Sequence, residues 1–226
     1  MAETKPIRII IADDHKLFRS GVISLLDDVE DIIIIAEVES GNELIEKYSE
    51  LMPDVMLVDI SMPGMGGIDA LKILRRNNKE VKAIILSMYD SDEYIYYAMK
   101  SGAKGMLSKN TMKGELIHAI KSVHDGNRYF GLRLTEDKIK ELEKRYKKII
   151  STDLENFEEL NSRDKVVLES ISKGLTSQEM ADKMGVSKKT IDYYRARIME
   201  RLQIKSSPEL VSYAVRYSLI NKLFDE

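Results

Sequence analysis

Short apolar runs alternate with amphipathic stretches over the first half of the chain, from Ile7 to about Asn127. Runs rich in apolar residues predict five strands, at 7–12, 32–38, 54–59, 82–87 and 104–108. Three- and four-residue spacing of apolar positions predicts five helices, near 16–26, 42–51, 68–77, 92–100 and 111–124. Such alternation is typical of an α/β fold with a doubly wound parallel sheet and helices on both faces.

The pattern changes after Gly126. Residues 135–150 place Ile139, Leu142, Tyr146 and Ile149 at helical spacing among dense charge, which predicts a linker helix. A helical spacer is the simpler interpretation, since a dimer-forming coiled coil needs more heptads. We therefore expect three parts, a first domain at 1–127, a helical linker at 128–157 and a second domain at 158–226.

The last part carries four short helical patterns and no strand signal, so an all-α domain is expected. Thr176 and Glu179 form a capping box that starts one helix. Gly185 breaks that helix, and Ser187 can cap the next one. This punctuation predicts a helix, a tight turn and a second helix.

Composition narrows the function classes. The 226 residues contain no cysteine, which excludes disulfides, cysteine zinc fingers and thiol catalysis. No apolar run reaches the length of a membrane span, and the N-terminal apolar stretch is too short for a secretory signal, so a cytoplasmic protein is expected. The formal net charge of -3 means that any contact with DNA must come from a local basic patch.

Polar side chains follow the ends of the predicted strands. Asp13 and Asp14 follow the first, Asp59 ends the third, Ser87 ends the fourth, and Lys109 follows the fifth. In an open parallel sheet these ends meet at the edge where ligands bind. Crowded carboxylates need a cation, and oxygen ligands suit Mg²⁺. With a lysine and a hydroxyl nearby, the pattern favours a phosphoryl site.

Four segments carry a family resemblance, "ADDH", "LVDISMPGMGG", "ILSMYD" and "SGAKGMLSK". In this order they resemble the receiver domain of two-component response regulators, a flavodoxin-like fold, over residues 5–127. The resemblance implies that Asp59 accepts a phosphoryl group from a sensor histidine kinase. It also implies Mg²⁺ bound directly by Asp14 and Asp59, through water by Asp13, and by the backbone carbonyl of Ser61, with Lys109 neutralising charge.

The resemblance makes Ser87 the switch residue that turns toward the phosphoryl group. Its usual aromatic partner falls at Met106, a departure that leaves the acceptor chemistry intact and questions the rotating-aromatic form of the switch. Tyr89 is a second candidate for the moving side chain, with ordinary packing as the other interpretation. For His15, beside the acids, a helix-surface role is expected rather than a metal-binding one.

The segment from Ser187 to Lys205 has six basic residues against Asp192 and Glu200, an excess that suits phosphate contacts in a DNA groove. "L-x-x-R-D", "GLTSQEMA" and "VSKKTI" resemble the LuxR/NarL/FixJ-type helix-turn-helix domain over roughly 158–222. The resemblance places the helix that starts near Lys188 in the major groove. The candidate DNA contacts are Lys188, Lys189, Thr190, Asp192, Tyr193, Arg195, Ala196, Arg197 and Lys205.

The final predicted helix, 208–219, carries Val211 and Val215 four residues apart. By resemblance this helix forms the dimer surface of DNA-bound subunits, and a plain core face is the equally weighted alternative.

Together these features predict a transcription factor whose DNA binding is controlled by phosphorylation of Asp59. The expected partners are a sensor histidine kinase, double-stranded DNA with paired half-sites, and a second copy of the chain when phosphorylated; RNA polymerase is left open, and no membrane partner is expected. The alternative is a phosphorylation-independent DNA-binding regulator with a scaffold receiver. An aspartyl-phosphate hydrolase is disfavoured, because Ser61 stands where its second acid belongs. Only Mg²⁺-dependent self-phosphorylation and slow self-dephosphorylation are expected.

Overall fold

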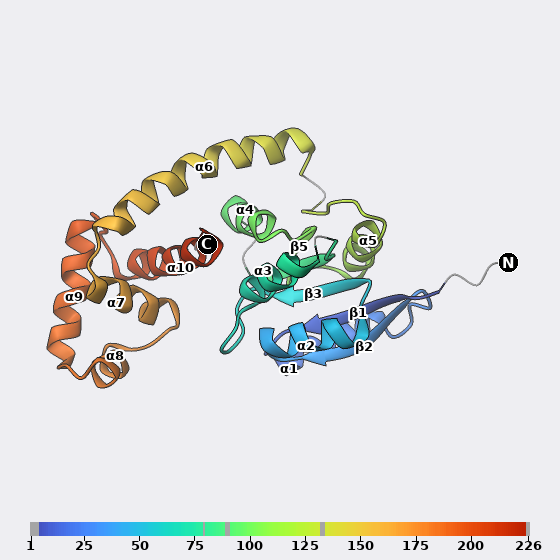
Figure 1. Ribbon diagram of the computed structural model, residues 1–226, viewed down its shortest axis with the longest axis horizontal. Helices are drawn as coiled ribbons and strands as arrows, with labels where there is room; N and C mark the ends of the chain where they lie inside the picture. The colour runs from blue at the N-terminus through green and yellow to red at the C-terminus, as the bar shows by residue number, and fades with distance from the viewer. Residues whose placement is uncertain (1–4, 79, 89–90, 132–133, 225–226) are drawn as a thin grey trace. The chain divides into compact units, whose positions relative to one another are not determined.

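Figure 1 shows a computed structural model of the chain, which describes residues 5–78, 80–88, 91–131 and 134–224. The chain divides into two compact units, Met1–Glu143 and Lys144–Glu226. The first is an α/β unit and the second is all-helical, as the sequence predicts. Tyr89, one candidate for the moving side chain, lies outside the described residues.

The first unit is built on a five-stranded parallel sheet with the strand order β2-β1-β3-β4-β5. The strands are β1 (Ile7–Ala12), β2 (Ile32–Val38), β3 (Val55–Asp59), β4 (Ala83–Ser87) and β5 (Gly105–Ser108). The helices between and after them are α1 (Lys16–Leu26), α2 (Gly41–Leu51), α3 (Gly67–Asn77), α4 (Asp92–Ser101) and α5 (Lys113–His124). The expected doubly wound fold is thereby confirmed.

Alternate residues of the strands bury against opposite layers of helices. Ile9 and Ile11 of β1 join Leu57 of β3 in a core cluster that includes residues of α1 and α5, such as Val22 and Ile120. On the other side of the sheet α3 contacts both α2 and α4. Burial of both faces explains why the strands read as continuous apolar runs.

The loop after β3 turns sharply because two glycines allow it. Gly64 has a φ of +71°, in the left-handed region that favours glycine. A Cβ on Gly67 would lie 2.0 Å from the carbonyl oxygen of Asp59, so the start of α3 packs directly on the end of β3. This close approach fixes the backbone next to Asp59.

The chain beyond residue 127 still belongs to the first unit. The backbone N–H of Met106 donates to the carbonyl of Tyr129, and the N–H of Tyr129 donates to the carbonyl of Lys104, both at 2.9 Å. Tyr129 thus forms a bridge with Gly105 at the outer edge of β5, and both Tyr129 and Phe130 are buried. The expected domain end at residue 127 falls just before these contacts.

Helix α6 (Glu136–Glu159) is longer than the predicted linker helix and contains the division between the two units. Its C-terminal half packs on α10 (Ser207–Phe224): the ring of Phe157 lies 4.7 Å from that of Tyr217, centroid to centroid. Asp153 pairs with Arg216 at 3.0 Å. The predicted start of the last domain at residue 158 therefore falls inside a helix that belongs in part to that unit.

The rest of the second unit comprises α7 (Ser162–Ser172), α8 (Ser177–Met184) and α9 (Lys188–Arg201). Thr176 and Glu179 form the predicted capping box at α8, Gly185 ends that helix with a φ of 66°, and Ser187 caps α9. The side chains of Leu168, Met180, Ile191 and Ile198 are buried between these helices. No helix among the described residues is both long enough and apolar enough to span a membrane.

Candidate functional site

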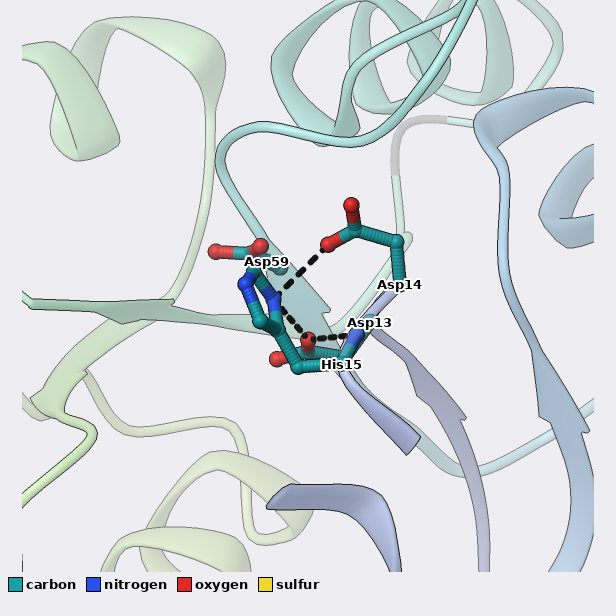
Figure 2. Close-up of side chains that lie close together, drawn as sticks. All are labelled: Asp13, Asp14, His15 and Asp59. Atoms are coloured by element: carbon teal, nitrogen blue, oxygen red, sulfur yellow. Dashed lines mark hydrogen bonds and ion pairs between the residues drawn. The ribbon is translucent and has the colours of Figure 1, made fainter. Parts of the chain in front are cut away.

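The predicted acidic residues converge at the carboxyl edge of the sheet (Figure 2). Asp13 and Asp14 directly follow β1, and Asp59 is the last residue of the neighbouring strand β3. Asp13, Asp14, His15 and Asp59 each offer one ligand atom, and these atoms all lie within 4.8 Å of one another. Three carboxylates from two strand ends thus form one cluster.

Lys109 joins this cluster from the loop after β5. Its Nζ lies 2.7 Å from Oδ2 of Asp13 and 3.1 Å from Oδ2 of Asp59. Burial raises the pKa of Asp59 to about 6; Lys109 opposes this shift, and the charges of Asp13 and Asp14 add to it. One lysine therefore does not offset the burial and crowding of three carboxylates, and the cluster favours a further positive charge.

Asp13 is fully buried and held on several sides. Its Oδ1 accepts a hydrogen bond from the backbone N–H of His15 at 2.8 Å, and its own N–H donates to the carbonyl of Val38 at 3.1 Å. The imidazole Nδ1 of His15 lies 2.9 Å from Oδ1 of Asp14. His15 precedes α1 and its ring is mostly exposed, as expected, but the ring also contacts the acids.

The donor set suits a hard divalent cation. Carboxylate oxygens on a half-open edge are the ligands that Mg²⁺ prefers, with room left for water. Asp14 is partly exposed and Asp13 is fully buried. Direct metal binding by Asp14 and water-mediated binding by Asp13 stay predictions. Ser61 lies on the exposed loop two residues after Asp59, and its carbonyl as a ligand stays a prediction.

The predicted switch residues lie on β4, which pairs with the strand of Asp59, and on β5, one strand further out. Ser87 ends β4 and is buried, and its carbonyl accepts a hydrogen bond from the N–H of Lys109 at 2.8 Å. Met106 is buried on β5, where it lines a hollow together with Ile95 and Phe130. Methionine is unbranched and flexible, so an adaptable side chain occupies the position where the resemblance places an aromatic.

One residue of this site was missed in the sequence. Arg19 of α1 is buried, and its guanidinium donates to the backbone carbonyl of Asp13. The signal was present, because Arg19 occupies the same helix face as the buried Val22 and Leu26. A charged residue on an apolar helix face requires partners.

The second candidate site is the outer face of α9. Five of the predicted DNA contacts are exposed on it, namely Lys188, Lys189, Asp192, Tyr193 and Ala196. Lys205 is exposed after the helix, while Arg195 and Thr190 are half-buried. The Thr190 hydroxyl lies 2.8 Å from that of Ser187, so it takes part in capping the helix. A helix with such an exposed basic end fits the major groove.

Arg197 faces the protein more than the prediction implies. Its Nη2 donates to Oδ1 of Asp164, a buried residue of α7, and its guanidinium lies 5.1 Å from the ring centre of Tyr194. The guanidinium that was predicted to contact DNA therefore pairs with Asp164. The role of Arg197 in DNA contact stays a prediction, and its contact with α7 is the observed one.

The two valines of the final helix, for which a dimer surface and a core face were the alternatives, differ in their exposure. Val211 is exposed, and Val215 is half-buried. The core face of α10 is formed instead by other residues, among them Leu210, Tyr213 and Ala214. Val211 therefore belongs to the accessible face of α10, which leaves a dimer surface there as a prediction.

Comparisons with known proteins agree with this architecture. Residues 9–121 match the family described as "Response regulator receiver domain", and residues 158–214 match "Bacterial regulatory proteins, luxR family". The oxygen regulatory protein NreC of Staphylococcus epidermidis is 36% identical over 216 residues, which cover 95% of this chain and 99% of that protein.

Two solved structures share the fold. A two-component response regulator of the LuxR family from Aurantimonas is 27% identical with a TM-score of 0.54, covering 63% of this chain and 99% of that one. The response regulator RcsB in a complex with DNA is 24% identical with a TM-score of 0.54, covering 93% of this chain and 98% of that one. The chain therefore belongs to the response regulators that combine a receiver domain with a C-terminal LuxR-family DNA-binding domain.

Proposed function

We propose that Asp59 accepts a phosphoryl group from the phosphohistidine of a sensor histidine kinase, and that this acyl phosphate controls DNA binding by the second unit. The supporting observation is the convergence of Asp13, Asp14, Asp59 and Lys109 at one edge of the sheet. A receiver domain implies a histidine kinase as partner.

In the proposed transfer, a carboxylate oxygen of Asp59 attacks the phosphorus while the bond from phosphorus to the imidazole nitrogen breaks. The imidazole leaves with the electron pair of that bond, and Asp59 becomes an acyl phosphate. Lys109, 3.1 Å from Asp59, is placed to pair with a phosphoryl oxygen as charge builds there. Asp13 and Asp14 would hold Mg²⁺, which when bound offsets the charge of the transferring group.

We propose that water later cleaves the same acyl phosphate slowly and releases inorganic phosphate, so that the signal limits itself. No second acid stands two residues after Asp59, where Ser61 lies instead. This arrangement supports self-phosphorylation and self-dephosphorylation rather than turnover of an external substrate.

On the DNA side, we propose that Lys188 and Lys189 contact phosphates and that Asp192, Tyr193 and Ala196 face base edges; the exposure of all five supports this. RcsB has been solved in a complex with DNA, and its dimers have been solved on DNA. By analogy of fold, we propose that two copies of this chain bind paired half-sites, with α10 as the candidate contact. RNA polymerase stays a predicted partner only.

The direct test is the intact mass of the protein after incubation with Mg²⁺ and a small-molecule acyl phosphate. We expect a base-labile phosphoryl adduct on the wild type and none on Asp59→Asn. Asp54→Asn is the matched control, because Asp54 precedes the same strand at its other end and accepts a hydrogen bond from the N–H of Arg8. An adduct on Asp59→Asn would assign the acceptor elsewhere.

DNA affinity is then compared in the two phosphorylation states at fixed salt. Coupling in allosteric proteins is typically about 1–3 kcal/mol, which predicts a change of about 5- to 150-fold. Equal affinity in both states would instead support the alternative function, a DNA-binding regulator with a scaffold receiver.

A further inference from the structure

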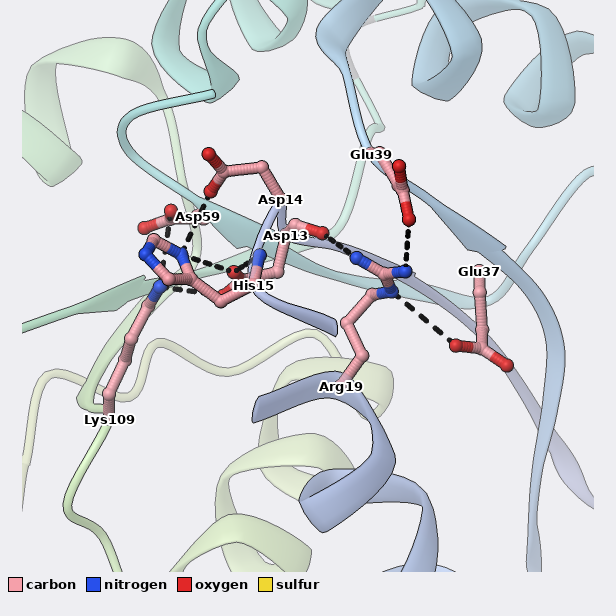
Figure 3. Close-up of polar contacts among 8 residues, drawn as sticks. All are labelled: Asp13, Asp14, His15, Arg19, Glu37, Glu39, Asp59 and Lys109. Atoms are coloured by element: carbon pink, nitrogen blue, oxygen red, sulfur yellow. Dashed lines mark hydrogen bonds and ion pairs between the residues drawn. The ribbon is translucent and has the colours of Figure 1, made fainter. Parts of the chain in front are cut away.

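A buried arginine lies beside the acidic cluster, with its guanidinium between Asp13 and the side chains of Glu37 and Glu39 (Figure 3). Arg19 projects from α1 and has only 5% of its surface exposed. Each nitrogen of its guanidinium has a partner: Nη1 donates to the carbonyl of Asp13, Nη2 to Oε1 of Glu39, and Nε to Oε2 of Glu37 at 3.4 Å. The guanidinium therefore joins the end of β1 to the end of β2.

Burying a guanidinium is costly unless its donors and its charge are both satisfied. Glu37 and Glu39 supply that charge, and each keeps about half or more of its side-chain surface exposed to solvent, at 46% and 61%. The planar fork of arginine matches several acceptors at once, which the single ammonium of a lysine does not. Arg19 is thus fixed from the β2 side, and its Nη1 donates a hydrogen bond to the carbonyl of Asp13.

The carbonyl that Arg19 holds belongs to the peptide group between Asp13 and Asp14. On the preceding side, the N–H of Asp13 donates to the carbonyl of Val38 at 3.1 Å. The backbone of Asp13 is therefore held at both its N–H and its C=O. The orientation of this planar peptide depends on ψ of Asp13 and φ of Asp14, and the same two angles influence the directions of the Cα–Cβ bonds of both residues. Holding the peptide therefore restricts where the carboxylates of Asp13 and Asp14 can point.

We propose that Arg19, secured by Glu37 and Glu39, is a positioning residue that orients the carboxylates of Asp13 and Asp14 for a divalent cation. The proposal rests on the proposed function, in which these carboxylates bind Mg²⁺. Arg19 contacts neither the cation nor the phosphoryl group, and it acts through the backbone. Outer residues that orient metal ligands typically change metal affinity about 10- to 100-fold when they are replaced.

The first measurement is Mn²⁺ binding to the full chain, followed by electron paramagnetic resonance of the free ion, without any phosphoryl donor. We expect Arg19→Met to weaken binding by about 10-fold or more, with Arg19→Lys between it and the wild type. Arg8→Met is the matched control, because Arg8 also donates to a backbone carbonyl, that of Met52, at the opposite end of β1. Arg8→Met should bind Mn²⁺ like the wild type.

A second measurement distinguishes a positioning role of Arg19 from a loss of folded protein in Arg19→Met. The rate of phosphorylation by an acyl phosphate is followed as the Mg²⁺ concentration is raised. Positioning predicts that Arg19→Met shifts the half-saturating Mg²⁺ concentration upward by about 10-fold or more and largely restores the rate at saturation. Loss of folded protein would lower the maximum and leave the half-saturating concentration unchanged.

If Arg19→Met fails to fold, the double variant Glu37→Gln/Glu39→Gln tests the proposal instead. Both side chains are substantially exposed, so this variant is expected to fold. Weaker Mn²⁺ binding by this variant, beyond that of the charge-matched Glu46→Gln/Glu50→Gln on α2, supports the proposal. Binding equal to that control, or an unchanged Mn²⁺ affinity in folded Arg19→Met, overturns it. A wild type that binds no Mn²⁺ would instead refute the proposed cation site itself.

Discussion

Replacing Asp59 by asparagine should stabilise the first unit, in a way that depends on pH. The Asp59 side chain is 8% exposed, and burial is the main reason why the pKa of its carboxyl rises from 3.8 to about 6. Asparagine has nearly the same shape as the protonated acid and carries no charge. The variant therefore removes the penalty of ionising a buried group and keeps the packing.

The sign follows from proton linkage. The folded protein holds the Asp59 proton more tightly than the unfolded chain, so this stabilising contribution is complete below pH 3.8 and is lost as the pH rises through about 6. Each pKa unit is worth about 1.4 kcal/mol, so the full loss is about 3 kcal/mol at most. Asp59→Asn should exceed the wild type by up to that amount above about pH 7 and by little near pH 4.

The assay is urea unfolding of both proteins across this pH range, with a chelator present, scored on the transition of the first unit. Asp54→Asn serves as control for the loss of one carboxylate. Carboxyl ¹³C NMR of Asp59 should give a midpoint near 6 in the folded wild type. A stability difference that does not vary with pH would refute the reasoning. Added Mg²⁺ should reduce the difference in free energy of unfolding between Asp59→Asn and the wild type, because Mg²⁺ stabilises the folded wild type by binding to it.

Three further outcomes are expected. Gly67→Ala should destabilise the first unit by about 2–4 kcal/mol in thermal unfolding, because the added Cβ would lie 2.0 Å from the carbonyl oxygen of Asp59. Gly114→Ala is the control and should be neutral or stabilising, because a Cβ at Gly114 would meet open space. Asp164→Ala and Arg197→Ala should each cost about 1–3 kcal/mol in the second unit, and strict additivity in the double variant would argue against their pairing. Lys188→Ala and Lys189→Ala should each lower the slope of log DNA affinity against log salt by about 1, whereas Lys121→Ala in the first unit should not.

Much of the first unit could be predicted from the sequence because its signals are local. Its apolar strands stand out from the amphipathic helices. The observed bounds of the strands differ from the predicted ones by one residue or less. The acidic cluster followed from one rule, that parallel strands end at the same edge of the sheet. Asp13, Asp59 and Lys109 meet there for that reason.

The misses concern contacts between distant segments. Helix α6 runs to Glu159 rather than residue 150, and its added turns carry Phe157, whose partner Tyr217 lies far along the chain. Arg197 reads as a DNA contact in its own helix, but it pairs with Asp164, 33 residues earlier. Local periodicity carries no information on such pairs, since tertiary packing overrides it.

The contacts of Tyr129 have a consequence for the solubility of the first unit. An edge strand with free N–H and C=O groups can pair with another chain and start aggregation. At β5 the backbone of Tyr129 occupies these groups on either side of Gly105. A receiver cut at residue 127 would lose this cover and leave the edge open to strand pairing between copies, whereas one that retains Tyr129 and Phe130 keeps the edge closed.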